Sequence, residues 1–309
     1  MAREKVSIDA DAATGYAFKD VDDGLALLYL LARPEEFDVL GVTSVYGNAS
    51  LPRTTLKAKE ILRVADRSEV PLYSGAHNRR GLGADTPASI FLREAAAKSP
   101  GEVTVLALGP LTNVATAGLG DPDFYANVKR IVVMGGALDE GFGIPLISPL
   151  EFNFFKDPVA ADMILDAPCD KIMITADLCR QVIFTRRELA SLYTMRNRAA
   201  TYLAYRIEPW LRLNQVAPFL AWKGGFVPWD VVAAVYLRRP ELFSEELLEG
   251  KKMKSGRLVT GALLPAPERE GRPAMIPTRL EPRQLLCEFL DAIAEFGSAG
   301  GSDRQATLD

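Results

Sequence analysis

Residues 6–23 read VSIDADAATGYAFKDVDD, and this stretch decides the fold that we expect. The short run at 5–8 predicts a buried strand, and the periodic apolar residues at 21–32 predict an amphipathic helix. A strand that leads into a helix begins a βαβ unit. Two acidic residues, Asp9 and Asp11, stand where the strand ends.

Short apolar runs and amphipathic segments alternate along the rest of the chain. We expect further strands at 38–45, 70–73, 102–108, 130–134 and 171–175, the one at 70–73 being short because it contains a proline. We expect helices at 56–65, from about 112, and at roughly 186–212, 230–237 and 283–296. This alternation predicts an α/β fold with an open, mostly parallel sheet and helices on both faces. No repeat or linker interrupts it, so we expect one domain over residues 1–309, with 297–309 as a flexible polar tail.

The composition is that of an ordinary globular protein, with 309 residues of which 48% are hydrophobic and 25% charged. A net charge of −4 and scattered basic residues argue against a nucleic-acid partner. No apolar run approaches the ~20 residues of a membrane span, and the N-terminus lacks the apolar region of a signal peptide. Three cysteines are too few for a disulfide framework, and an odd number cannot all be paired. We therefore expect buried, reduced cysteines and a cytoplasmic location.

The chain contains a single histidine, His77, and this limits the possible chemistry. One histidine excludes multi-histidine zinc sites and the two-histidine iron site. The Gly-x-Ser-x-Gly sequence of one large class of serine hydrolases is also missing. We interpret His77 as a solvated loop residue. Carboxylates must then carry any acid–base or metal chemistry.

Four aspartates at the first strand–helix junction are candidates for that chemistry. Asp9 and Asp11 leave the strand, and Asp22 and Asp23 open the helix. Ligands in α/β folds bind beyond the carboxyl ends of the strands, so these carboxylates can converge there on one cation. Oxygen-only ligands suit Ca²⁺ or Mg²⁺. The alternative for Asp22 and Asp23 is that they only complement the helix dipole.

Two known aspartate motifs fit this spacing poorly. An EF-hand loop that began at Asp9 would need a glycine where Thr14 stands. A phosphatase of the haloacid dehalogenase type has Thr or Val two residues after its second aspartate, and Ala13 stands there.

Other small or polar residues stand at predicted strand ends or in the loops after them. They occupy 43–48, 107–113, 133–137 and 151–158. Residues 227–230 read VPWD, and Asp230 is placed either to cap the next helix or to join the site.

Together and in this order, these stretches resemble the inosine-uridine-preferring nucleoside hydrolase family, from Val6 to about Leu237. The resemblance implies an open α/β fold and calcium-dependent hydrolysis of the N-glycosidic bond of a nucleoside, by attack of a water held on the ion. It also implies a homodimer or homotetramer that acts in purine salvage or nucleoside catabolism.

The resemblance assigns the metal site residue by residue. The calcium ligands would be the side chains of Asp11, Asp23 and Asp230 and the backbone carbonyl of Leu108. Asp9 would stand behind them as a supporting carboxylate. Asp11 would also be the catalytic general base on the attacking water.

The resemblance assigns the substrate contacts in the same way. Asn48 would help to place the attacking water beside the sugar. Asp22, Glu151 and Asn153 would hold the ribose hydroxyls. Trp229 stands where the family often has a histidine that protonates the leaving base. A purine-preferring branch of the family has a tryptophan that stacks on the base, so Trp229 favours a purine; the alternative is a core residue.

Two further departures from the family's pattern concern loops. Residues 12–21 form a longer spacer than the family's short Pro-Gly turn, and they either overhang the pocket or form a surface insertion. The asparagine expected before Glu151 is missing from residues 143–150, which read GIPLISPL.

Two other functions remain open at this point. One is a Mg²⁺-dependent phosphatase with Asp9 as nucleophile and Asp11 as acid. The other is a non-catalytic nucleoside-binding protein with the same fold.

Overall fold

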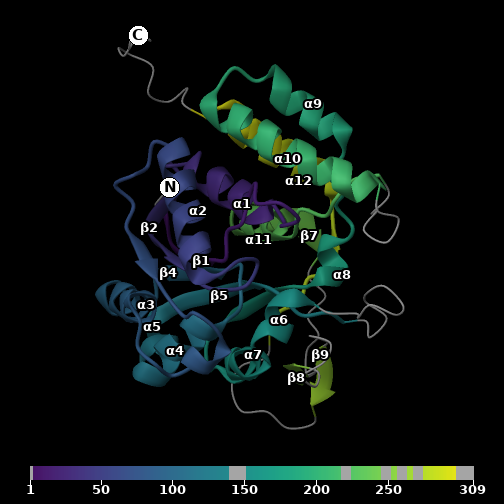
Figure 1. Cartoon of the computed structure of the whole chain (residues 1–309). Helices are drawn as coiled ribbons and strands as arrows, with labels where there is room; N and C mark the ends of the chain where they lie inside the picture. Colours follow the sequence, from purple (N-terminus) through teal and green to yellow (C-terminus); the bar gives the residue numbers. More distant parts are fainter. Residues whose placement is uncertain are drawn as a thin grey trace.

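The computed structural model describes residues 3–138, 151–216, 224–244, 252–255, 263–266 and 274–296. Its centre is a six-stranded sheet in the order β3-β2-β1-β4-β5-β6, and every neighbouring pair is parallel (Figure 1). The strands are β1 (Glu4–Ala10), β2 (Phe37–Ser44), β3 (Leu72–Ser74), β4 (Val103–Ala107), β5 (Val128–Met134) and β6 (Lys171–Ile174). This topology confirms the predicted α/β class.

The chain reverses its direction across the sheet between β1 and β4. From β1 it proceeds outward through β2 to β3, and it then returns to β4 and proceeds the other way to β6. Such a reversal leaves a crevice at the carboxyl ends of the two central strands, where α/β folds bind ligands. Asp9, near the end of β1, pairs in register with Thr43 of β2 and Ala107 of β4.

Two helical layers cover the two faces of the sheet (Figure 1). The upper layer in that view contains α1 (Asp22–Leu31), α2 (Leu51–Val64), α9 (Arg186–Thr194), α10 (Arg198–Val216), α11 (Trp229–Arg238) and α12 (Pro282–Ala294). The lower layer contains α3 (Pro87–Lys98), α4 (Thr112–Gly120), α5 (Phe124–Asn127) and α7 (Pro158–Asp166). The short helices α6 (Phe152–Lys156) and α8 (Ala176–Cys179) follow β5 and β6.

Short antiparallel pairs complete the described chain. They are β7 (Phe243–Ser244) with β10 (Arg279–Leu280), and β8 (Lys252–Ser255) with β9 (Leu263–Ala266).

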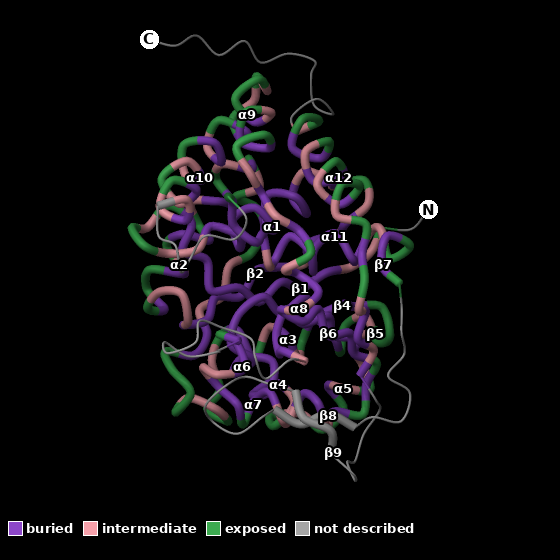
Figure 2. The backbone as a smooth tube through the Cα atoms, turned by 90° about the vertical axis from the view of Figure 1, so that its right-hand side faces the viewer, coloured by how far each residue is buried: buried purple, intermediate pink, exposed green. Residues whose placement is uncertain are grey.

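Alternate residues of the central strands enter two separate cores. Ile8 of β1 and Leu106 of β4 lie in the core under α1 and α11, whereas Val105 and Val133 lie in the core under α4 and α7. Helix α1 is buried on all sides, as Figure 2 shows for this central part of the molecule. Both ends of α1 are therefore fixed by packing, including the N-terminus that carries Asp22.

Three predicted boundaries were wrong, each for a local reason. Helix α2 begins at Leu51 rather than at 56, because Pro52 sits in its first turn, where a missing N–H costs nothing. Strand β3 begins only after Pro71. The segment 186–212 is two helices, because Asn197 begins α10 by accepting a hydrogen bond from the Ala200 N–H at 2.8 Å.

Some sequence expectations concern the cysteines and the chain ends. None of the three cysteines forms a disulfide; Cys169 and Cys179 are buried, but Cys287 is exposed, so the expectation of three buried cysteines was wrong. No helix of the described segments is both long and apolar enough to cross a membrane. Residues 143–150 and 297–309 lie outside the described residues, so the predicted tail stays a prediction.

Candidate active site

Three aspartates from two helix N-termini meet beyond the carboxyl end of β1. Asp22 and Asp23 open α1, and Asp230 is in the first turn of α11. Each offers a carboxylate oxygen that lies within 4.8 Å of the other two, and all three side chains are buried. The backbone N–H of Asp230 donates to Asp22 at 3.3 Å. Because α1 and α11 pack against each other, their N-terminal ends present these carboxylates at one point.

Asp11 lies beside this cluster and is held by Asn48. The Asp11 N–H donates to Asp23 Oδ1 at 3.1 Å. The Asn48 N–H donates to Asp11 Oδ2 at 2.5 Å, and its side-chain amide lies 3.3 Å from Asp11 Oδ1 and 3.4 Å from Asp23 Oδ2. Gly47 permits this approach, since a Cβ there would stand 1.9 Å from Asp11 Oδ2. Asn48 thus links the aspartate after β1 to the aspartates of α1.

Asp9 lies near the end of β1 and is held from the face of the sheet that α4 covers. Its Oδ1 accepts hydrogen bonds from Thr43 Oγ1 at 2.6 Å and from Asn113 Nδ2 at 2.8 Å. Its Oδ2 is buried without a hydrogen-bond partner in the described part of the chain. Burial raises the pKa of Asp9 to about 7. Asp9 does not line the cavity described below.

The acidic cluster carries an unusual density of buried negative charge. Burial raises the pKa of Asp11 to about 7 and that of Asp22 to about 6. Burial and the repulsion of neighbouring carboxylates raise the pKa of Asp20, Asp23 and Asp230 well above the ordinary value. Within the described residues, no lysine or arginine forms an ion pair with any of the five. Buried carboxylates without a counter-charge fit a cation, and oxygen donors fit a hard one.

Glu151, Asn153 and Leu108 join the cluster from the neighbouring strand ends. The Asn153 amide donates to the Leu108 carbonyl at 2.9 Å and to the Met134 carbonyl at 3.1 Å. Glu151 caps α6, and its carboxylate accepts from the N–H groups of Asn153 and Phe154 at 2.9 Å each and from Gly136 at 2.8 Å. Both side chains are therefore locked by backbone groups.

One cavity of about 320 Å³ connects these groups with a set of aromatic side chains. Six of the predicted site residues line it with polar side chains or backbone groups, namely Asp22, Asn48, Leu108, Glu151, Asn153 and Asp230. A seventh, Trp229, lines it together with three further aromatic residues, Phe18, Phe152 and Trp210. Asp11 and Asp23 lie behind the lining, in hydrogen-bond contact with Asn48.

Several residues that line the cavity were not assigned from the sequence, among them Asp20, Phe152 and Trp210. Asp20 accepts a hydrogen bond from the Val21 N–H at 2.7 Å and adjoins Asp22. Its position in the acidic run at 20–23 (DVDD) is the sequence feature that could have indicated its place at the cavity. Trp210, in the predicted helix at 186–212, is half-buried, packs against the hydrophobic core and also lines the cavity. Phe18 lies in the spacer 12–21, for which overhanging the pocket was one of two alternatives. Trp222 lies outside the described residues.

The strand order and the acidic cavity together define an α/β protein with a metal-type site at its topological switch point. A sequence profile for the inosine-uridine preferring nucleoside hydrolases matches residues 6–284, and the chain belongs to this family. It is therefore an enzyme of the N-ribohydrolase class. The family is metal-dependent, and the acidic cluster is consistent with this.

Individual relatives agree with this assignment. A probable uridine nucleosidase of Arabidopsis thaliana is 33% identical over 228 residues, which cover 65% of this chain and 68% of the relative. A non-specific ribonucleoside hydrolase of Shigella flexneri is 30% identical over 251 residues, covering 72% and 78%. The solved structure of a purine-preferring ribonucleoside hydrolase from Gardnerella vaginalis is similar in fold, with a TM-score of 0.81, 23% identity, and coverage of 96% and 100%.

Proposed function

We propose that this protein hydrolyses the N-glycosidic bond of a ribonucleoside with Ca²⁺, favours a purine or purine-like base, and releases base and ribose. The observation that carries this proposal is one cavity lined both by acidic and amide groups, which suit an ion and a sugar, and by aromatic side chains, which suit a flat base.

The ion would be held by the side chains of Asp11, Asp23 and Asp230 and by the Leu108 carbonyl. Asp22 is in the same cluster and would be shared between ion and sugar. Calcium suits this set better than magnesium because it accepts six to eight oxygen ligands in flexible geometry. When bound, the ion would fix the sugar diol and lower the pKa of the attacking water.

Asp11 would accept the proton of the attacking water. Its carboxylate is already oriented by the Asn48 N–H at 2.5 Å, so little reorganisation is needed. Asn48 itself lines the cavity, where its side-chain amide can also contact the water. The oxocarbenium-like charge that develops on the sugar would be stabilised by the surrounding carboxylates.

Asp22, Glu151 and Asn153 would bind the ribose hydroxyls. The Asn153 Nδ2 is used by two backbone carbonyls, which leaves Oδ1 as its acceptor for a hydroxyl. Glu151 already accepts three N–H groups, and a carboxylate offers about four acceptor positions, so one can serve a hydroxyl.

Trp229 and Trp210 would bind the base, because both residues line the cavity. His77, the single histidine, is exposed and does not line that cavity, so an imidazole acid for the leaving base has no source there. Stacking on indole can raise the basicity of a purine nitrogen, so that solvent protonates it. This favours purines over pyrimidines.

A nucleoside screen tests this function. Release of reducing sugar from inosine, adenosine, guanosine, uridine and cytidine is measured with Ca²⁺, with a chelator, and with Ca²⁺ or Mg²⁺ added back. We expect ribose release that the chelator abolishes and Ca²⁺ restores, with purines turned over faster. Faster turnover of uridine would contradict the purine preference alone.

Two further measurements, phosphate release from a sugar phosphate and saturable nucleoside binding, address the two other functions. A phosphatase would release inorganic phosphate from a sugar phosphate, but its nucleophile would be Asp9, which is fully buried and held by Thr43 and Asn113. A non-catalytic protein would bind nucleoside saturably without releasing ribose. Family membership favours neither.

We also propose that the protein works in the cytoplasm as a homodimer or homotetramer, in nucleoside catabolism or purine salvage. None of its three cysteines forms a disulfide, which suits a reducing compartment. Light scattering on the eluted protein would measure the oligomeric state.

A further inference from the structure

Phe18 lies at the mouth of the cavity in a conformation that a bulky residue rarely adopts. Its φ is +59°, in the left-handed region. Its side chain is 79% exposed, yet it lines the same cavity as Asp22 and Trp229. Backbone strain of this kind persists only where the surrounding structure holds it, and it occurs most often at functional sites.

Thr14 holds the segment 12–21 at its base. Its hydroxyl donates to the Val21 carbonyl at 3.0 Å and accepts from the Gly24 N–H at 3.0 Å. These two bonds tie the beginning of the segment to its end and to the first turn of α1, the helix that carries the metal-type carboxylates. The position of the segment relative to the cluster is therefore fixed.

Tyr16 holds the segment against α2. Its hydroxyl donates to the Arg53 carbonyl at 3.3 Å, and the Arg53 guanidinium lies 4.0 Å from the centre of the tyrosine ring. On the other side, a Cβ on Gly15 would stand 2.5 Å from Arg206 Cδ, so the backbone also touches α10. With its neighbours anchored to two helices, the Phe18 ring stays exposed beside the cavity.

We propose that Phe18 is a specificity-determining residue: its ring forms the outer wall of the base site and selects nucleosides with a flat, aromatic base. This role rests on the N-ribohydrolase activity proposed above. Aromatic side chains bind bases by stacking on their π-faces, an interaction that every aromatic base can make and a saturated ring cannot. Phe18 lines the cavity together with Trp210 and Trp229, the two rings proposed to bind the base, so its contribution is expected at the base.

The test compares Phe18→Ala with the wild type on inosine, uridine and 5,6-dihydrouridine, whose base is saturated and not flat. Loss of one stacking partner should lower kcat/KM for inosine and uridine by about 5-fold or more. The value for dihydrouridine and the inhibition constant of free D-ribose should stay unchanged. Each substrate is compared only with itself, so differences in leaving-group reactivity cancel.

Three further variants separate stacking from folding. Phe18→Gly removes the ring and suits a positive φ, so we expect the same catalytic loss with an equal or higher Tm. Phe18→Trp should keep kcat/KM. Leu119→Ala, at an exposed apolar position on α4, should change nothing.

Equal losses on uridine and dihydrouridine, a parallel weakening of ribose inhibition, or full activity of Phe18→Ala would each overturn the role of Phe18. A wild type that releases no ribose from any nucleoside would instead overturn the proposed function. The two failures are thus distinguishable.

Discussion

Asp11 is proposed to have two roles, since it would both bind the ion and accept a proton from the attacking water. Its backbone N–H donates to Asp23, and its carboxylate accepts from Asn48, so both its position and its orientation are fixed within the fold. A substitution that preserves shape can therefore remove the charge without moving the chain.

We expect Asp11→Asn to lower kcat by about 10²- to 10⁴-fold, the usual contribution of a general base. Steady-state kinetics on the best substrate measures this, and the thermal unfolding curve checks the fold. Asp162→Asn, on the partly buried outer side of α7, is the matched control and should keep kcat. A near-normal kcat for Asp11→Asn would exclude it as the base.

Trp229 is the residue on which the purine preference depends. Trp229→Ala should lower kcat/KM for purine nucleosides by about 5- to 150-fold, which corresponds to the 1–3 kcal/mol of a lost stack. Nitrophenyl riboside needs no protonation of its leaving group, so its kcat/KM should fall much less. Trp229→Phe keeps an aromatic ring and serves as the control. Equal losses on both substrates would make Trp229 a structural residue.

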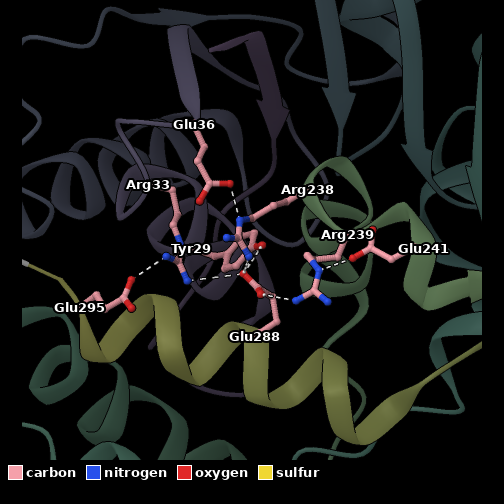
Figure 3. A network of polar contacts seen from close by, with 8 residues as sticks. All are labelled: Tyr29, Arg33, Glu36, Arg238, Arg239, Glu241, Glu288 and Glu295. Carbon is pink, nitrogen blue, oxygen red and sulfur yellow. Dashed lines mark hydrogen bonds and ion pairs between the residues drawn. The ribbon is translucent and has the colours of Figure 1, made fainter. Parts of the chain in front are cut away.

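At the scale of elements, α1 and α11 are joined at the ends that lie away from the site. Both helices begin at metal-type aspartates, and their C-terminal ends meet α12 in a polar network (Figure 3). Glu288 of α12 is its centre and is only 6% exposed. It accepts from the Tyr29 hydroxyl at 3.1 Å and pairs with Arg33 at 3.5 Å, Arg238 at 2.5 Å and Arg239 at 2.9 Å.

We expect Glu288→Gln to lower the free energy of unfolding by about 1.5–3 kcal/mol, the contribution of hydrogen bonds to a charged group. The three arginines lose their shared buried partner, but each keeps one carboxylate, namely Glu295, Glu36 or Glu241. Urea unfolding at saturating Ca²⁺ measures it.

Glu241→Gln is the matched control for this network. Glu241 pairs with the same Arg239 but is 60% exposed, so its loss should cost less than about 1 kcal/mol. Equal costs for Glu241→Gln and Glu288→Gln would show that burial does not matter in the network.

At the scale of the whole molecule, local patterns were enough to predict the first strand, the first helix and the position of Asp9 and Asp11. They were enough because strand and helix periodicity are read within a few residues. The approach of Asp230 to Asp22 could not be read this way, since 208 positions separate them and only the packing of α11 on α1 brings them together. The resemblance to a family supplied that pairing.

The aromatic residues that line the cavity were the hardest part to predict. Trp210 lies on an amphipathic helix, where a tryptophan is usually a core residue, and its place at the cavity depends on how α10 lies over the segment 12–21. Phe18 lies in the spacer 12–21, whose length left overhanging the pocket as one alternative, but nothing in the sequence indicates its positive φ. Tertiary contacts, rather than propensity, place both rings.

Burial of so many carboxylates makes the stability of the whole protein depend on the ion and on pH. Asp9 and Asp11 have folded-state pKa values of about 7, and Asp22 of about 6, all above the value of about 4 for an unfolded aspartate. Between those limits the folded state binds more protons than the unfolded state. The free energy of unfolding of the metal-free protein should therefore fall as pH rises from about 4 to 7.

Calcium should restore the free energy of unfolding that is lost as pH rises, because it replaces the protons as counter-charge and binds only the folded cluster. At a free Ca²⁺ concentration of 100 times Kd, the gain is about 2.7 kcal/mol, or roughly 4 °C in Tm for a chain of this size. Thermal unfolding at pH 5 and pH 8, with chelator and with Ca²⁺, measures both effects. We expect the chelated protein to have a lower Tm at pH 8 than at pH 5, and the gain from Ca²⁺ to be larger at pH 8, since protons no longer compete for the carboxylates.

Asp230→Asn removes one carboxylate from the cluster. It should reduce both the gain in Tm from Ca²⁺ and the pH dependence of the Tm. A Tm that Ca²⁺ leaves unchanged at pH 8 would show that these carboxylates do not hold the ion.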